Sequence, residues 1–232
     1  MQGVAVSAEP SGRRHYVGVR VKFCGITNLD DGREAARLGA WAIGLNHHPE
    51  SPRFCEPQVA VEVGTALKRQ LEVVGVFVNP TLDELATAAQ DESLTMIQLH
   101  GDEGPAFCQE VARRTGCKVI KALRVRSGAD LRVAETYRTD FHLLDGHRPG
   151  MSGGTGERFD WQLLAGRRSE VPLILAGGLT PENVADGVAA ARPFAVDVAS
   201  GVEAEPGVKD RALMAKFLES AQRGSVDPRV VA

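Results

Sequence analysis

Two side chains suited to proton transfer end short apolar runs in this 232-residue sequence. Cys24 ends the run Val21–Cys24, and Asp145 ends the run Phe141–Asp145. A thiolate can accept a proton and a carboxylic acid can donate one, so the two can act as a general base and a general acid if the fold brings them together. Each also has a plainer explanation: a free cysteine often packs as a small apolar side chain, and an aspartate before Gly146 suits a turn or a helix cap.

Glycine-bearing turns late in the sequence are candidates for binding an anion. They are Gly153-Gly154-Thr155-Gly156, Gly177-Gly178 and Ser200-Gly201. Such turns expose backbone N–H groups, which bind phosphate without basic side chains. Glycines also serve ordinary tight turns, so a single pair is weak evidence. Two such turns after two successive late strands indicate a phosphate site.

Arg53 is the candidate for binding a carboxylate. It follows Pro52, which stiffens the backbone, and a guanidinium can hold a carboxylate in a two-pronged fork. A solvated surface arginine is the alternative. In the same loop His47 and His48 are adjacent, but no further ligand at a suitable spacing accompanies them. We therefore expect no metal at this loop.

The elements that must position these residues alternate between strands and helices. The expected strands are 19–23, 42–45, 72–78, 96–100, 119–125, 141–145, 173–176 and 195–198. The expected helices are 31–38, 57–67, 82–89, 105–114, 129–137, 161–165, 181–190 and 210–221, with Thr81 and Glu84 as a capping box and Thr180-Pro181 as another helix start. The alternation predicts an α/β fold with a parallel sheet, and eight units predict a single-domain (β/α)8 TIM barrel. A doubly wound open sheet is the alternative, but its G-x-G-x-x-G turn is absent.

Active sites of such barrels lie at the carboxyl ends of the strands. Side chains alternate along a strand, so Lys22 and Cys24 share one face and Val21 and Phe23 share the other. We expect Lys22 and Cys24 to face the barrel interior, with Cys24 near its mouth. A nearby ammonium would lower the pKa of that thiol.

Composition sets the wider limits. Residues 1–18 are expected to be a disordered extension, 19–223 the catalytic barrel and 224–232 a C-terminal tail.

The formal net charge is −3, so no basic excess favours a nucleic-acid partner. No run of apolar residues is long enough for a signal peptide or a membrane span, and the four cysteines form no C-x-x-C pair. We expect a cytoplasmic protein with reduced thiols, acting as a monomer, with a homodimer as the alternative.

An ordered set of motifs resembles the phosphoribosylanthranilate isomerases of tryptophan biosynthesis. The set runs through Lys22–Thr27, Ser51–Arg53, Val74–Asn79, Gln98–Gly101, Leu143–Asp145, Gly153–Gly156 with Phe159–Trp161, Gly177–Asn183, and Val196–Glu203 with Pro206-Gly207 and Lys209-Asp210. Each motif is weak alone, whereas their order over roughly Val19 to Ala221 is specific. His47 and His48 stand where many members have aromatic residues, Ala199 replaces a frequent serine, and Glu157-Arg158 replace a more usual Lys-Thr.

The resemblance implies an Amadori rearrangement of a small phosphorylated substrate without a cofactor. N-(5-phosphoribosyl)anthranilate would become 1-(2-carboxyphenylamino)-1-deoxyribulose 5-phosphate. Carried onto this chain, Cys24 is the general base, Asp145 the general acid and Arg53 the ligand of the anthranilate carboxylate. The remaining substrate-binding residues implied are Gly154, Gly177, Gly178, Asp197, Ser200 and Gly201.

Two other functions compete with this one. The first is the related barrel isomerase of the histidine pathway, or a dual-substrate enzyme serving both pathways; the base at the end of strand one resembles aspartate in those proteins, which Cys24 disfavours. The second is a non-catalytic phosphate-binding barrel, since a fold alone does not determine function. A binding protein needs neither Cys24 nor Asp145.

Overall fold

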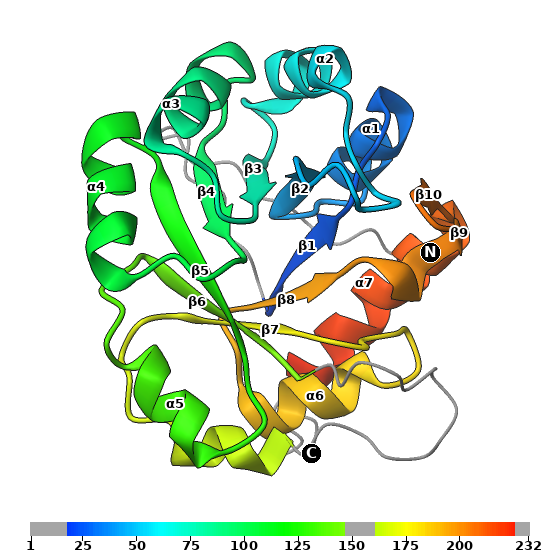
Figure 1. The fold of residues 1–232 in the computed structure, drawn as a ribbon. Helices are drawn as coiled ribbons and strands as arrows, with labels where there is room; N and C mark the ends of the chain where they lie inside the picture. Colours follow the sequence, from blue (N-terminus) through cyan, green and yellow to red (C-terminus); the bar gives the residue numbers. More distant parts are fainter. Residues whose placement is uncertain (1–17, 147–160, 226–232) are drawn as a thin grey trace, which may run out of the picture.

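Eight parallel strands close into a barrel in the computed structural model, which describes residues 18–146 and 161–225 (Figure 1). The strands are β1 (Arg20–Cys24), β2 (Ala42–Asn46), β3 (Glu72–Phe77), β4 (Met96–Leu99), β5 (Lys118–Arg124), β6 (Phe141–Asp145), β7 (Leu173–Ala176) and β8 (Ala195–Val198). Each pairs with its neighbour in sequence, and β1 pairs with β8, with Lys22 opposite Asp197. The predicted (β/α)8 barrel is therefore confirmed, and the open sheet is excluded.

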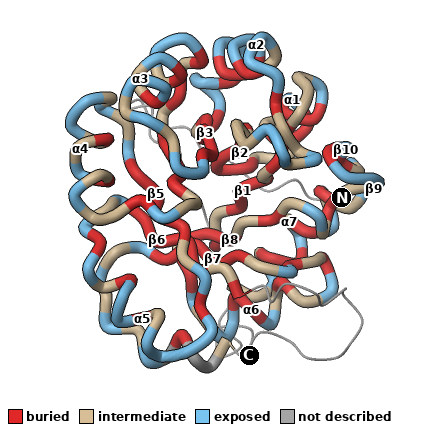
Figure 2. Tube along the Cα trace, in the orientation of Figure 1, coloured by how far each residue is buried: buried red, intermediate tan, exposed pale blue. Residues whose placement is uncertain are grey.

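Helices ring the barrel. They are α1 (Leu29–Arg37), α2 (Pro57–Leu67), α3 (Leu82–Asp91), α4 (Pro105–Thr115), α5 (Gly128–Ala134), α6 (Val184–Ala191) and α7 (Arg211–Ser225), with the 3-10 helices η1 (Trp161–Gly166) and η2 (Ser200–Val202). The predicted capping box is present: Thr81 Oγ1 accepts from the Glu84 N–H at 3.2 Å, and the Glu84 carboxylate accepts from the Thr81 N–H at 2.7 Å. The outer surfaces of these helices are exposed while the strands beneath them are buried (Figure 2).

Two predicted helices differ from the structure in type or in start, and two others end elsewhere: α5 ends at Ala134 rather than 137, and α7 at Ser225 rather than 221. The segment beginning at Trp161 is the 3-10 helix η1 rather than an α-helix. Helix α6 begins at Val184 after Asn183, so the predicted start at Thr180-Pro181 is wrong. The Asn183 side chain accepts from the Thr180 N–H and donates to the Gly178 carbonyl, which holds residues 180–183 as a turn closing the preceding loop.

The predicted alternation on β1 is confirmed. Val21 and Phe23 belong to the large apolar cluster between the barrel and its helices, whereas Lys22 is fully buried on the opposite, interior face. A second apolar cluster fills the interior from the other strands; it includes Ala42, Val74, Met96, Ile120, Leu143, Ile174 and Ala195. This packed interior leaves only the strand ends available for chemistry.

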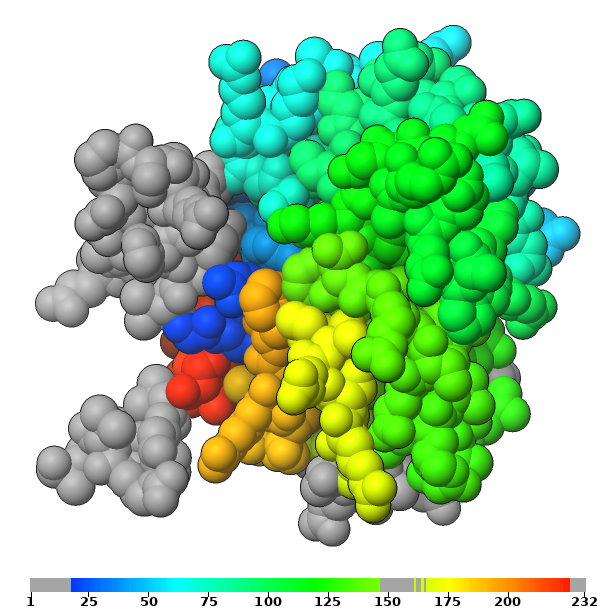
Figure 3. Space-filling view, turned by 90° about the vertical axis from the view of Figure 1, so that its left-hand side faces the viewer, coloured from blue at the N-terminus to red at the C-terminus, as the bar shows by residue number. Residues whose placement is uncertain are grey.

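The two ends of the barrel chain meet at one place. The Val19 N–H donates to Ser225 Oγ at 2.9 Å, and Gln222 Nε2 donates to the Val19 carbonyl at 2.8 Å. Figure 3 shows these first residues, in blue, against the red end of α7. A short hairpin that the sequence did not predict, β9 (Glu203–Glu205) with β10 (Val208–Lys209), lies between η2 and α7. In the part of the chain that the structure describes, no helix is long and apolar enough to span a bilayer.

Candidate active site

A buried lysine links the first and last strands beside Cys24. Lys22 Nζ lies 2.8 Å from Asp197 Oδ1, and the Lys22 side chain is 0% exposed. Burial alone would lower the pKa of Lys22, but Asp197 and Cys24 outweigh it and raise the pKa. The site therefore holds a charged ammonium beside the candidate base.

Cys24 ends β1 and is partly exposed, as expected near the barrel mouth. Its pKa is nevertheless raised, because burial is the largest influence and outweighs Lys22 and Lys209, which lower it. The expected lowering by an ammonium is thus present but is not the net result. Gly44 of β2 makes the space for this arrangement: a Cβ there would lie 2.8 Å from Cys24 Sγ and 3.1 Å from Lys22 Nζ.

Asp145 occupies the predicted position at the carboxyl end of β6, where it is half-buried. It lies opposite Arg124 of β5 and Ala176 of β7. Nearby on the mouth is His100, which follows β4; burial lowers the pKa of its imidazole, and Asp145 is the strongest charge opposing that shift. The structure therefore adds His100, to which the sequence assigned no role, to the neighbours of the candidate acid.

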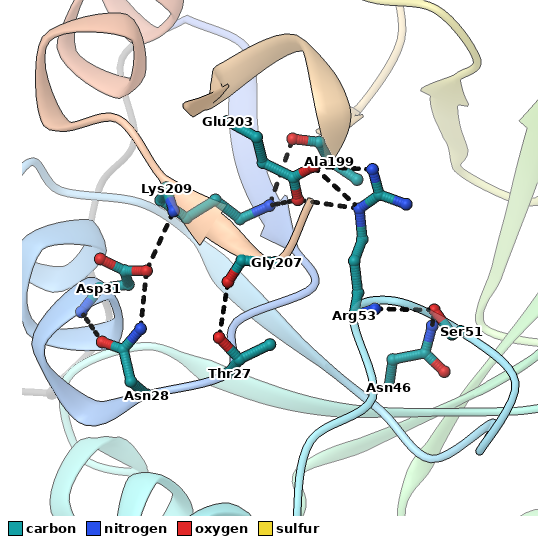
Figure 4. Close-up of polar contacts among 10 residues, drawn as sticks. All are labelled: Thr27, Asn28, Asp31, Asn46, Ser51, Arg53, Ala199, Glu203, Gly207 and Lys209. Atoms are coloured by element: carbon teal, nitrogen blue, oxygen red, sulfur yellow. Dashed lines mark hydrogen bonds and ion pairs between the residues drawn. The ribbon is translucent and has the colours of Figure 1, made fainter. Parts of the chain in front are cut away.

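Arg53 meets a partner that the sequence did not indicate (Figure 4). Its Nε and Nη2 atoms donate to the Glu203 carboxylate at 2.8 and 2.7 Å, and Lys209 Nζ donates to the same carboxylate at 2.7 Å. The Arg53 stem crosses Gly25, where a Cβ would lie 2.7 Å from Arg53 Cδ. The aliphatic stem of Arg53 thereby lies against the residue that follows Cys24.

The two glycine turns expected to bind phosphate are in contact. Gly177 and Gly178 follow β7 with φ of 95° and 64°, a left-handed conformation that glycine adopts readily. Ser200 and Gly201 follow β8 in η2, and a Cβ on Gly201 would lie 2.0 Å from the Leu179 carbonyl. The turns after β7 and β8 therefore meet at one position of the mouth. Gly154 lies outside the described residues.

The paired histidines of the loop after β2 are turned to protein partners. His47 Nε2 lies 2.7 Å from a carboxylate oxygen of Glu92, its Nδ1 lies 3.1 Å from the Leu45 carbonyl, and its ring stacks on Phe77 with 4.3 Å between centroids. His48 Nε2 lies 3.8 Å from Glu50. Within residues 18–146 and 161–225, no three His, Cys, Asp or Glu side chains are grouped to hold a metal ion.

The structure thus brings most of the predicted site residues to one end of the barrel and adds two charged partners. Asp197 was expected from the resemblance to touch the substrate, but its carboxylate is engaged by Lys22. Glu203 and Lys209 both lie in motifs quoted above, yet nothing local in the sequence links Glu203 to Arg53, which is 150 positions away.

Known proteins resemble the chain over nearly its whole barrel. Residues 21–220 match the family model described as N-(5'-phosphoribosyl)anthranilate (PRA) isomerase. The N-(5'-phosphoribosyl)anthranilate isomerases of Geobacter sp. (strain M21) and Geobacter sulfurreducens are 43% and 45% identical, covering 88% of this chain and 98% of each relative. The crystal structure of phosphoribosyl anthranilate isomerase from Thermotoga maritima matches with a TM-score of 0.80 and 41% identity, over 88% of this chain and 98% of that one. Another phosphoribosyl anthranilate isomerase structure, in complex with reduced 1-(o-carboxyphenylamino)-1-deoxyribulose 5-phosphate, matches with a TM-score of 0.77 and 39% identity, with the same coverage.

Proposed function

The chain belongs to the N-(5'-phosphoribosyl)anthranilate isomerase family, and from that premise we propose how its residues divide the work of the reaction. It is an isomerase of tryptophan biosynthesis that converts N-(5-phosphoribosyl)anthranilate to 1-(2-carboxyphenylamino)-1-deoxyribulose 5-phosphate. The proposal concerns the roles of individual side chains and the absence of a cofactor from the mechanism.

Asp145 acts as the general acid and Cys24 as the general base. Asp145 gives a proton to the ribose ring oxygen, the ring C–O bond breaks, and the furanose opens to a Schiff base. Cys24, as the thiolate, then removes the proton from the adjacent carbon, which leaves an enolamine that tautomerises to the ketone. Each positioned acid or base is worth about 10²–10⁴-fold in rate.

The raised pKa of Cys24 makes Lys22 part of this step. At neutral pH the thiolate is a minor form in the unliganded site, since burial disfavours the charge. The buried Lys22 ammonium is the larger of the two cationic contributions, with Lys209, that stabilise the thiolate when it forms. Positive charge fixed in place before the reaction costs no reorganisation when the proton moves.

Arg53 binds the anthranilate carboxylate, and the turns at Gly177, Gly178, Ser200 and Gly201 bind the phosphate with Gly154. Two observations support these roles: the turns after β7 and β8 are in contact, and Arg53 crosses Gly25 beside Cys24. Phosphate held by N–H groups is common at this corner of such barrels. Asp197 lies at the substrate-binding end of the barrel, where its carboxylate holds the Lys22 ammonium in place.

The observation that carries the assignment is the placement of Cys24 and Asp145 on the interior of one barrel mouth, at the ends of β1 and β6. The test is turnover of the fluorescent substrate by the purified chain with a chelator present. Loss of substrate fluorescence at the same rate with and without the chelator supports the proposal. Turnover of the histidine-pathway ribonucleotide instead would favour the related isomerase, and binding without any turnover would favour the non-catalytic barrel.

We further propose that the chain acts as a monomer in the cytoplasm. All four cysteines are free thiols, which suits a reducing compartment. One structural relative from Thermotoga maritima is described as dimeric, so a homodimer is the alternative. Sedimentation equilibrium over a range of concentrations distinguishes the two states.

A further inference from the structure

We propose that Glu203 is a positioning residue that aims the Arg53 guanidinium at the substrate carboxylate, with buried Lys209 keeping the cluster cationic. This inference rests on the proposed role of Arg53. The three residues come from the loop after β2 and from the two strands of the β9–β10 hairpin, and they meet at one point of the barrel mouth (Figure 4).

The geometry of the fork determines which edge of Arg53 is left for a ligand. Nε lies 2.8 Å from Glu203 Oε1, and Nη2 lies 2.7 Å from Oε2. A guanidinium carries five N–H groups in one plane, and this contact uses the edge formed by Nε and Nη2. The end formed by Nη1 and the second hydrogen of Nη2 can still hold another carboxylate bidentately. Glu203 therefore selects the direction in which Arg53 binds.

The exposure of the two side chains also indicates that Glu203 holds Arg53 from below while Arg53 faces the ligand. The Glu203 side chain is 4% exposed, whereas that of Arg53 is 24% exposed. The carboxylate thus lies beneath the guanidinium, which faces the mouth. Burial would raise the pKa of Glu203, but the hydrogen bonds from Arg53 and Lys209 outweigh it and lower the pKa, so the carboxylate is charged.

Lys209 compensates for the negative charge that Glu203 places next to Arg53. An anion next to Arg53 would neutralise it and repel a substrate carboxylate. Lys209, 0% exposed, places its ammonium 2.7 Å from Glu203 and 3.2 Å from the Ala199 carbonyl. Burial lowers the pKa of Lys209, and its hydrogen bond to Glu203 opposes that shift. With Lys209 protonated, two cations and one anion leave a net positive charge, which an anionic ligand can satisfy.

The hairpin that carries Glu203 is fixed to the segment that follows Cys24, which comprises the loop after β1 and the start of α1. Thr27 Oγ1 donates to the Gly207 carbonyl at 2.6 Å, and the Lys209 N–H donates to Asp31 Oδ2 at 3.2 Å. Gly207, with φ of 84°, packs against the loop after β2: a Cβ there would lie 2.9 Å from the Pro52 carbonyl. The hairpin therefore holds Arg53 in register with the candidate base.

A double-mutant cycle tests the proposal. Dissociation constants are measured for Arg53→Ala, Glu203→Gln and the double variant, with two probes: reduced 1-(o-carboxyphenylamino)-1-deoxyribulose 5-phosphate, and the same compound without its carboxyl group. We expect each single variant to raise the dissociation constant of the probe that has the carboxylate by about tenfold or more. The dissociation constant of the probe without it should change by no more than about twofold. Because Glu203 acts through Arg53, the double variant should bind no worse than Arg53→Ala. KM should rise more than kcat falls.

Matched variants separate positioning from loss of structure. Glu110→Gln breaks a similar Glu–Arg fork, with Arg113 on the outside of α4, and should change neither probe. If Glu203→Gln does not fold, Glu203→Gln/Lys209→Met removes an anion and a cation together and should show the same loss confined to the carboxylate probe.

The outcomes are distinct. If Arg53→Ala weakens both probes equally, the proposed role of Arg53 fails and the inference falls with it. If Arg53→Ala is selective but Glu203→Gln is not, or if the two losses add, Glu203 is not a positioning residue while the proposed function stands.

Discussion

Lys22 on β1 donates a 2.8 Å hydrogen bond to Asp197 on β8, and both residues face the barrel interior beside Cys24. The pair lies where the first strand of the barrel meets the last. The pair therefore has two effects: it neutralises a lysine that closure of the barrel buries, and it keeps a cation next to the thiol that we propose reacts as a thiolate.

Replacing Lys22 by Met should affect both tasks. Breaking a buried pair costs about 3–5 kcal/mol, and without the ammonium the Cys24 thiol should ionise at a higher pH. Thermal unfolding and the pH dependence of Cys24 alkylation measure the two effects. Lys121→Met is the control, because it breaks an equally buried pair, with Glu103. Lys121→Met should destabilise the barrel without shifting the pH dependence of Cys24 alkylation. If the two variants give the same pH dependence, Lys22 does not influence the ionisation of the thiol.

Cys24 itself should be essential but unreactive at neutral pH. Cys24→Ala should lower kcat by at least about 10²-fold while the fold remains intact. Since the pKa of the thiol is raised, thiolate accumulates only as the pH rises through that value, so inactivation by iodoacetamide should accelerate toward alkaline pH and be slowed by a bound product analogue. Alanine at Cys55, whose pKa burial raises to about 12, should leave kcat nearly unchanged.

Gly44→Ala should displace the thiol that we propose as the general base. The added Cβ would meet Cys24 Sγ and Lys22 Nζ at 2.8 and 3.1 Å, so at least one of the two must move. A displacement of this kind should reduce kcat by about tenfold or more. Gly128→Ala, where the nearest atom is the flexible Arg132 Nη1 at 4.0 Å, should keep wild-type kcat. Normal turnover in Gly44→Ala would mean that the thiol position tolerates this shift.

Arg53→Ala should weaken substrate binding by about 1.5–3 kcal/mol, the usual value of a charge-assisted hydrogen bond. Glu203 retains Lys209 as its partner in this variant, so the buried carboxylate is not left unpaired and the thermal transition should change little. Titration calorimetry with carboxylate-bearing and carboxylate-free analogues measures the effect. A large fall in melting temperature would assign Arg53 to loop structure instead.

Asp145→Asn removes the transferable proton but keeps the size of the side chain. Ring opening should be abolished while a product analogue still binds. Single-turnover kinetics beside binding of that analogue give the answer. Unchanged turnover would exclude Asp145 as the acid, and loss of binding together with turnover would indicate a structural carboxylate.

Local patterns in the sequence predicted the fold of this protein and the positions of several residues at the barrel mouth. Alternating short apolar strands and amphipathic helices predicted the barrel, because the periods of strands and helices differ along any chain. The alternation of side chains on β1 placed Lys22 and Cys24 inside, and it did so without knowledge of their neighbours. Residues at strand ends and glycines in turns marked the mouth for the same local reason.

Tertiary structure alone decided the partners and the electrostatics. The Glu203 fork on Arg53 and the Lys22–Asp197 pair span 150 and 175 positions in sequence, so only closure of the barrel brings them together. The helix start at Thr180-Pro181 was wrong because Asn183 is drawn to the loop after β7. The pKa of Cys24 is raised although an ammonium is adjacent, because desolvation depends on every atom packed around the thiol, and the sequence shows only the charges.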